Sequence, residues 1–166
     1  MFDVKMFENM TLESKLDTML IMLEGLVEGD DLDLTKACNG VALINALIGR
    51  ANWCGFYFVK GKDLILGPFQ GMPACTKIEI GKGVCGTAAY KKETLLIKNV
   101  HEFEGHIACD AASNSEVVIP IVKDNVLYGV LDLDSDEFER FTAVEQKYLE
   151  KAVEIMNRHI NWEKIF

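Results

Sequence analysis

The sequence predicts an α+β fold, in which helices from both ends of the chain pack on one face of a central, mostly antiparallel sheet of about six strands. Two observations lead to this prediction. Apolar residues recur every three or four positions near both ends of the chain, whereas they alternate with period two between residues 52 and 134. No repeat, low-complexity tract or linker interrupts the sequence, so we expect one domain over residues 1–166.

Three helices are predicted outside the sheet region. The first follows Thr11, a suitable N-cap, and carries apolar residues at helical spacing over about four turns. The second covers residues 32–48, and Cys38 within it is expected to be a small buried apolar residue. The last begins at Thr142, where Glu145 completes a capping box.

The middle of the chain is expected to form the strands and one further helix. The predicted strands are residues 53–59, 64–66, 77–80, 95–97, 116–122 and 126–134. A short helix at 84–90 follows a glycine-rich turn at 81–83, which lacks the spacing of a phosphate-binding loop. The segment 99–114 is a long loop, and such loops are often functional. Trp53 and Tyr57 share one face of their strand, where they either wall a pocket or pack in an ordinary core.

Charge and composition exclude several classes of partner. The chain has 26 acidic against 17 basic residues and a net charge of -9, which argues against nucleic acid and anionic membranes as partners. We see no signal peptide and no apolar stretch near the roughly 18 residues of a membrane span. Five cysteines in such a chain indicate free thiols in a reducing compartment, so we expect a cytoplasmic protein.

The cysteines are the first candidates for chemistry. Cys109 lies among small residues in the segment 106–116, and we interpret it as a redox nucleophile. Cys75 and Cys85 also lie in a loop or at a helix start. With His106 these thiols could form a zinc site, but the absence of a Cys-x-x-Cys pair favours a nucleophile with a resolving thiol. We therefore expect no metal ion and no cofactor. Cysteines in the regular elements are expected to be buried and inert: Cys38 and Cys54.

The second group of candidates is acidic: Asp110, Glu116, Asp132 and Asp134. A spacing of two places Asp132 and Asp134 on one face of their strand. Carboxyl groups gathered in a cavity repel one another, so at least one holds its proton near neutral pH and can donate it to a leaving oxygen. Alternatively the acids bind an ammonium ion, or they are only a solvated strand end.

The turn between the last two strands decides whether Glu116 joins this group. A two-residue turn at 124–125 would place Glu116 opposite Leu133, facing away from the aspartates. A three-residue loop, or a bulge near Pro120, reverses that parity. We therefore predict such an irregularity, or that Glu116 still lies in a loop.

Five segments carry specific motifs: NWCGFY at 52–57, GPFQG at 67–71, GKGVCGTA at 81–88, HIACDAASNSE at 106–116 and VLDLDS at 130–135. They resemble the motifs of the free methionine-R-sulfoxide reductases, which are enzymes with a GAF-like fold. The resemblance spans roughly residues 52–142, with compatible helices on both sides, and the motif at 106–116 is highly specific.

This resemblance implies a reaction. Cys109 would attack the sulfur of free methionine-R-sulfoxide, take the oxygen as a sulfenic acid and release methionine. Cys75 would then form a disulfide with Cys109, and thioredoxin would reduce it. Cys85 would be a third catalytic thiol, whose part in turnover the resemblance leaves open.

The resemblance also implies a binding pocket. Trp53 and Tyr57 would wall it around the methyl group and sulfur. Glu116, Asp132 and Asp134 would bind the ammonium group and assist protonation of the oxygen, without a fixed assignment among them. A peptide-bound residue offers no ammonium group and would leave these acids unpaired, which would explain selectivity for the free amino acid.

A different class of function uses the same fold. GAF-like domains also act as non-catalytic sensors that bind small molecules, often cyclic nucleotides, next to an output domain. The three motif cysteines, and the absence of an expected output domain, favour the enzyme. By analogy with the fold we expect a homodimer.

Overall fold

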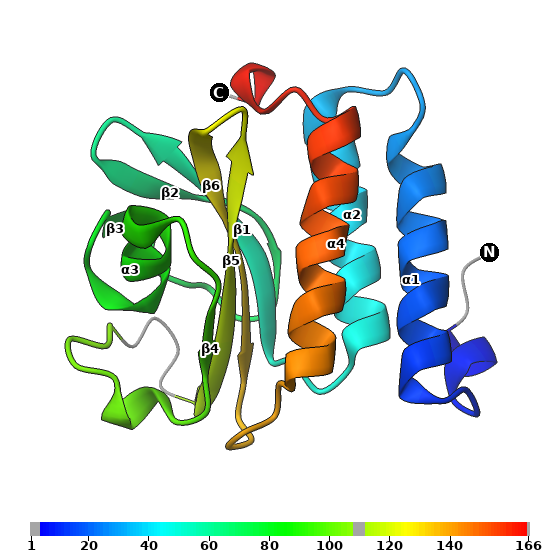
Figure 1. Ribbon diagram of the computed structural model, residues 1–166, viewed down its shortest axis with the longest axis horizontal. Helices are drawn as coiled ribbons and strands as arrows, with labels where there is room; N and C mark the ends of the chain where they lie inside the picture. The colour runs from blue at the N-terminus through cyan, green and yellow to red at the C-terminus, as the bar shows by residue number, and fades with distance from the viewer. Residues whose placement is uncertain (1–3, 108–111, 166) are drawn as a thin grey trace.

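In the computed structural model, which describes residues 4–107 and 112–165, the strands form one sheet in the order β3-β2-β1-β6-β5-β4 (Figure 1). Every neighbouring pair in this order is antiparallel. The strands are β1 (Trp53–Lys60), β2 (Asp63–Gln70), β3 (Lys77–Glu79), β4 (Leu95–Ile97), β5 (Ser115–Lys123) and β6 (Val126–Ser135). The chain therefore builds the predicted antiparallel sheet with β1 and β6 at its centre.

The helices divide between the two faces of this sheet (Figure 1). The α-helices are α1 (Leu12–Val27), α2 (Asp33–Ile48), α3 (Gly83–Lys91) and α4 (Ala143–His159), with 3-10 helices at Val4–Phe7, Val100–Glu102 and Trp162–Lys164. The terminal helices α1, α2 and α4 lie together on one face, whereas α3 lies on the other. This arrangement is a GAF fold and confirms the predicted α+β architecture. No described helix is long and apolar enough to cross a bilayer.

The predicted helix starts are confirmed by their caps. The Thr11 hydroxyl accepts a hydrogen bond from the backbone N–H of Ser14 at the start of α1. At the start of α4, the Thr142 side chain accepts from the Glu145 N–H, and the Glu145 carboxylate accepts from the Thr142 N–H. Arg140 ties this carboxylate to the rest of the molecule, because its guanidinium contacts Glu145 at 2.6 Å and also donates to the carbonyl oxygen of Ile48 at the end of α2.

Each face of the sheet packs against its own apolar core. The alternation along β1 puts Cys54 and Phe56 in the larger core beneath α1, α2 and α4. Trp53 and Tyr57 belong to the smaller core beneath α3. The predicted sharing of faces along this strand is therefore confirmed, and so is the burial of Cys54.

The β5–β6 hairpin contains the irregularity that the sequence required. Its turn at 124–125 has two residues, both with positive φ (51° and 64°), which matches the right-handed twist of the strands. The register shifts by one residue at 121–122, and beyond this bulge Glu116 lies opposite Asp134. The predicted irregularity near Pro120 is confirmed, and it returns Glu116 to the aspartate face.

The prediction for Cys38 is wrong, because its side chain is exposed. Ala37 and Val41 of α2, four residues apart, are the ones that face the core. Cys38 follows Ala37 by one residue and is turned by roughly 100° around the helix axis, out of the buried stripe.

Candidate active site

The acids predicted from the sequence lie on neighbouring strands, on the sheet face that α3 covers. Glu116 on β5 is opposite Asp134 on β6, and Asp132 is two residues before Asp134 on the same face. β6 also pairs with β1, where Gly55 lies opposite Asp132. Because directly paired residues share a face of the sheet, three carboxyl groups meet at one end of the smaller core.

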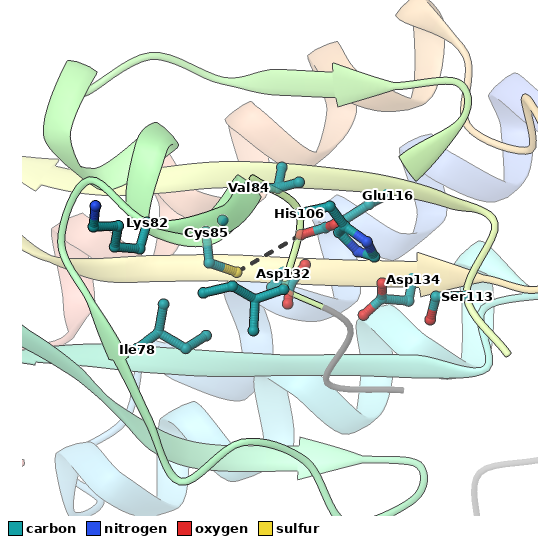
Figure 2. Close-up of a pocket in the computed structure, with 11 residues that line it drawn as sticks. Ile78, Lys82, Val84, Cys85, His106, Ser113, Glu116, Asp132 and Asp134 are labelled. Atoms are coloured by element: carbon teal, nitrogen blue, oxygen red, sulfur yellow. Dashed lines mark hydrogen bonds between the residues drawn. The ribbon is translucent and has the colours of Figure 1, made fainter. Parts of the chain in front are cut away.

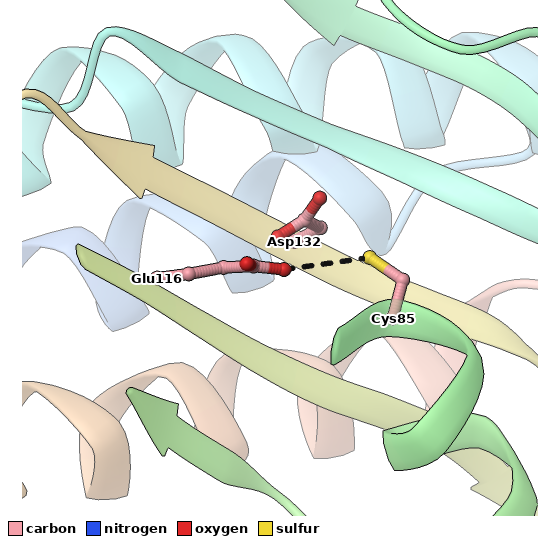
Figure 3. Close-up of side chains that lie close together, drawn as sticks. All are labelled: Cys85, Glu116 and Asp132. Carbon is pink, nitrogen blue, oxygen red and sulfur yellow. Dashed lines mark hydrogen bonds between the residues drawn. The ribbon is translucent and has the colours of Figure 1, made fainter. Parts of the chain in front are cut away.

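Cys85 approaches this group from α3. Its thiol donates a hydrogen bond to Oε1 of Glu116 at 3.8 Å, and Figure 3 shows Cys85, Glu116 and Asp132 pointing toward one another. The glycine-rich sequence explains the close approach of the helix. A Cβ atom at Gly86 would lie 2.4 Å from the carbonyl oxygen of Glu79, so only glycine lets α3 pack against the end of β3 in this way.

A small cavity of about 30 Å³ adjoins these side chains (Figure 2). It is lined by Ile78, Lys82, Gly83, Val84, Cys85, His106, Ile107, Ser113, Glu116, Asp132 and Asp134. This volume accommodates a water molecule but is far smaller than an amino acid. Any larger ligand must therefore move the lining side chains apart.

Two buried oxygen atoms on the cavity wall have no hydrogen-bond partner among the described residues: Oδ1 of Asp132 and Oγ of Ser113. Buried polar atoms without partners are costly and uncommon in folded proteins. Their presence on the same cavity indicates a surface adapted to a polar ligand. Figure 2 shows Ser113 beside Asp134, at the opposite end of the cavity from Lys82.

Burial without a compensating cation determines the protonation of the site. No described Lys, Arg or His side chain forms an ion pair with Glu116 or Asp132. Burial, followed by the negative charge of Asp132, raises the pKa of Glu116 well above its usual value. Burial also raises the pKa of Asp132 to about 6. Near neutral pH the pair therefore offers a protonated carboxyl group beside an ionised one.

The same environment affects the Cys85 thiol. Burial, and then the charges of Asp132 and Glu116, raise its pKa well above that of a free cysteine. The thiolate is the nucleophilic form, so a thiol held in this state is a weak nucleophile at neutral pH. The structure therefore shows Cys85 as a hydrogen-bond donor to Glu116.

The predicted aromatic walls lie behind the cavity. Trp53 and Tyr57 are buried, stack with ring centroids 5.7 Å apart, and are not among the residues that line the cavity. The Trp53 indole N–H donates to the carbonyl oxygen of Met72 at 3.2 Å, and the Tyr57 hydroxyl donates to that of Cys75 at 2.9 Å. In this structure both rings support the segment that carries Cys75, and contact with a ligand stays a prediction.

The redox cysteines are only partly within the described chain. Cys75 is disulfide-bonded, whereas Cys38, Cys54 and Cys85 carry free thiols. Cys109 and Asp110, which the sequence also singles out, lie outside the described residues.

Sequence reasoning missed Ser113 and gave His106 only a role as a zinc-ligand candidate. Both side chains line the cavity. A signal was available in the sequence, since both residues lie in the motif at 106–116 that contains Glu116 and carries the resemblance.

Comparisons with known proteins agree with this geometry. The GAF domain family matches residues 37–160. The free methionine-R-sulfoxide reductase of Escherichia coli is 47% identical over 128 residues, which cover 77% of this chain and 78% of that protein. The Saccharomyces cerevisiae protein of the same name is 40% identical over 158 residues, which cover 90% of this chain and 88% of that protein. The structure of the Neisseria meningitidis free methionine-R-sulfoxide reductase with its substrate is 34% identical, covers 89% of each chain and superposes with a TM-score of 0.85.

Proposed function

The chain belongs to the free methionine-R-sulfoxide reductases of the GAF domain family, and we propose that it reduces free methionine-R-sulfoxide to methionine. The observation that carries this proposal is the group of three acids, Glu116, Asp132 and Asp134, on one cavity, where no described basic side chain forms an ion pair with the two buried ones, Glu116 and Asp132. A free amino acid brings an ammonium group that supplies the missing charge. A peptide-bound residue does not.

The other side of the cavity suits the carboxylate of the same amino acid. Gly83, Val84 and Cys85 form the first turn of α3 and line the cavity, and the N-cap residue Lys82 makes no side-chain capping bond. The N–H groups and the positive end of the helix dipole at such a terminus favour an anion. Acids on the sheet and a helix N-terminus opposite them complement a zwitterion.

The protonation of the two buried acids supports different roles for them. Glu116, whose pKa is raised the more strongly, is our proposed donor to the sulfoxide oxygen. Asp132, which is ionised above a pKa of about 6, is our proposed ammonium ligand together with Asp134. Cys85 would act by holding Glu116 in place through its hydrogen bond rather than as a nucleophile.

In the proposed reaction, the thiolate of Cys109 attacks the sulfoxide group while Glu116 gives a proton to the oxygen. The sulfur–oxygen bond of the substrate breaks, Cys109 carries the oxygen away as a sulfenic acid, and the thioether of methionine is released. The Cys75 thiol displaces that oxygen as water and forms a disulfide, and the dithiol of thioredoxin reduces the disulfide.

The cysteine states of the structure support this cycle. Cys75 is disulfide-bonded while Cys38, Cys54 and Cys85 are free, which supports the role of Cys75 as a thiol that forms a disulfide during turnover. We further propose that the cycle runs in the cytoplasm, because thioredoxin keeps thiols reduced there.

The test is NADPH oxidation in the presence of thioredoxin reductase, thioredoxin and this protein. Free methionine-R-sulfoxide, its S epimer and a peptide-bound R-sulfoxide are supplied in parallel. We expect turnover with the free R form alone, loss of turnover in Cys109→Ser, and full activity in the matched control Cys38→Ser. No turnover with any sulfoxide, measured with Cys75 and Cys109 fully reduced, would reject the proposal in favour of a ligand sensor.

A further inference from the structure

Cys85, Glu116 and Asp132 form a set of metal-ligating side chains that converge from α3, β5 and β6 (Figure 3). One sulfur and one oxygen from each carboxyl group all lie within 4.8 Å of one another. A tetrahedral zinc ion holds such ligands roughly 3.5 Å apart, given bond lengths of about 2.3 Å to sulfur and about 2.0–2.2 Å to oxygen. The pair already in hydrogen-bond contact, Cys85 Sγ and Glu116 Oε1, is 3.8 Å apart, so small side-chain movements would close the set around an ion.

An independent observation also indicates a ligand at this place. Oδ1 of Asp132 and Oγ of Ser113 are buried on the same cavity and have no partner among the described residues. Within the described chain, no basic side chain is ion-paired with Glu116 or Asp132. Two buried acids and an unpartnered oxygen therefore face a small space in which no described basic side chain is ion-paired with either acid, although Lys82 lies at its far end.

We propose that Cys85, Glu116 and Asp132 bind a divalent cation of the zinc class, and that this ion excludes the ammonium group of the substrate. The metal site stands on its own, whereas the competition rests on the proposed function. Three protein ligands leave the fourth position of the ion to water. The cavity of about 30 Å³ suits an ion of this size but not an amino acid. An ion can therefore bind to this conformation of the protein, whereas the substrate cannot.

Binding is a ligand exchange without a redox step. The ion displaces the proton of the Cys85 thiol and that of the Glu116 carboxyl group, and it neutralises the charge of Asp132. Protons are therefore released to solvent as the ion binds. Affinity therefore rises with pH, because the ion and protons compete for the same ligand atoms.

The binding test uses the oxidised protein carrying Cys38→Ser, which removes the exposed thiol while the disulfide protects Cys75. Zn²⁺ is titrated by calorimetry, and Cd²⁺ by the ultraviolet charge-transfer band of a metal–thiolate bond. We expect one ion per chain, a band that disappears in Cys85→Ser, and affinity lowered at least tenfold in Asp132→Asn. Cys54→Ala, on the opposite face of the sheet, is the matched control and should keep the band.

Two results would overturn the metal site: no charge-transfer band, or a band that persists in Cys85→Ser. Circular dichroism and the thermal midpoint establish that each variant is folded. If Cys85→Ser fails to fold, Glu116→Gln decides the same question, because an amide is a poor zinc ligand and should lower the affinity and the number of protons released.

Competition is tested separately by single turnover of the pre-reduced protein, with methionine quantified directly so that zinc does not act on a coupling enzyme. We expect Zn²⁺ to slow the reaction, excess substrate to relieve the effect, and the inhibition constant to rise at least tenfold in Cys85→Ser relative to that variant's own rate. Binding without inhibition would reject the competition and keep the site. Absence of turnover would reject the proposed function, and the titration would still decide the site.

Discussion

Two glutamates on opposite sides of the sheet show how differently one side chain is used in this protein. Glu145 and Glu116 are 1% and 5% exposed. Glu145, under the terminal helices, meets the Arg140 guanidinium at 2.6 Å and accepts two hydrogen bonds from Thr142. Glu116, under α3, has the Cys85 thiol at 3.8 Å and the carboxyl groups of Asp132 and Asp134 nearby, and no described basic side chain forms an ion pair with it.

The contrast teaches that burial alone does not assign a role to an acid. Glu145 is satisfied within the chain, so its contacts serve to fix the start of α4 against the end of α2. Glu116 has no ion-pair partner among the described residues, so its carboxyl group can exchange a proton or bind a cation from solution. The acid paired within the chain and the acid proposed to act on substrate lie on opposite faces of one sheet.

The largest effect should come from removing the acid on the α3 side. We expect Glu116→Gln to lower kcat/KM for free methionine-R-sulfoxide about 10²–10⁴-fold, because the amide cannot deliver a proton to the oxygen. The thermal midpoint should stay the same or rise, since a group that favours its neutral form is replaced by a neutral one. The coupled assay and a thermal melt measure both quantities, and a retained rate would contradict the assignment of Glu116.

The matching substitution, at the partner of Glu145 on the face covered by the terminal helices, should lower the stability of the fold. Arg140→Leu leaves Glu145 buried without its cation, and we expect a loss of about 3–5 kcal/mol in the free energy of unfolding. Urea denaturation measures it. The double variant Arg140→Leu, Glu145→Gln should recover part of the loss because it no longer buries a charge. Equal destabilisation in both would show that lost packing of the arginine dominates.

A pH series should sharpen the comparison further. The pKa of Asp132 is about 6 in the folded chain against an ordinary value of 3.8, because burial raises it, so the folded state holds this proton more tightly. The resulting stabilisation is complete below the unfolded pKa and is lost as the pH rises through about 6. Relative to Asp132→Asn, the native protein should lose on the order of 2 kcal/mol between pH 4 and pH 7. Parallel stability curves for the two proteins would rule this out.

The smallest expected effect lies in a helix cap far from the cavity. Thr11→Ala removes the acceptor for the Ser14 N–H, and we expect a loss of about 1 kcal/mol in unfolding free energy with unchanged kcat/KM. Urea denaturation measures the change in unfolding free energy, and the coupled assay measures kcat/KM. A fall in activity at this position would mean that the two faces of the sheet are coupled.

Much of the fold could be predicted because its elements obey local rules. The cap at Thr11 and the capping box at Thr142 set helix starts that the structure confirms. The parity argument for Glu116 also succeeded, because side chains in a strand alternate strictly and a two-residue turn demanded a bulge. Cys38 was misjudged because one position of helical phase separates its exposed side chain from the buried Ala37.

The site was less predictable, since its decisive contacts are made between distant segments. That Cys85 donates a hydrogen bond to Glu116 follows from the packing of α3 on the sheet, which no local pattern encodes. That no described basic side chain is ion-paired with Asp132 is likewise a property of the assembled molecule. The sequence identified Cys85 and the three acids that line the cavity, but not which of them hold protons.

The exposed side chain of Cys38 has a consequence for how oxidation of this protein is monitored. A surface thiol reacts with alkylating reagents in the native state, whereas the buried thiols of Cys54 and Cys85 react only after unfolding. Among the cysteines that the structure describes, a thiol count on the folded, oxidised chain should therefore return Cys38 alone. Covalent dimers on a non-reducing gel would likewise report surface cross-linking through Cys38. They would carry no information about the catalytic state, so Cys38→Ser is the appropriate background for redox experiments.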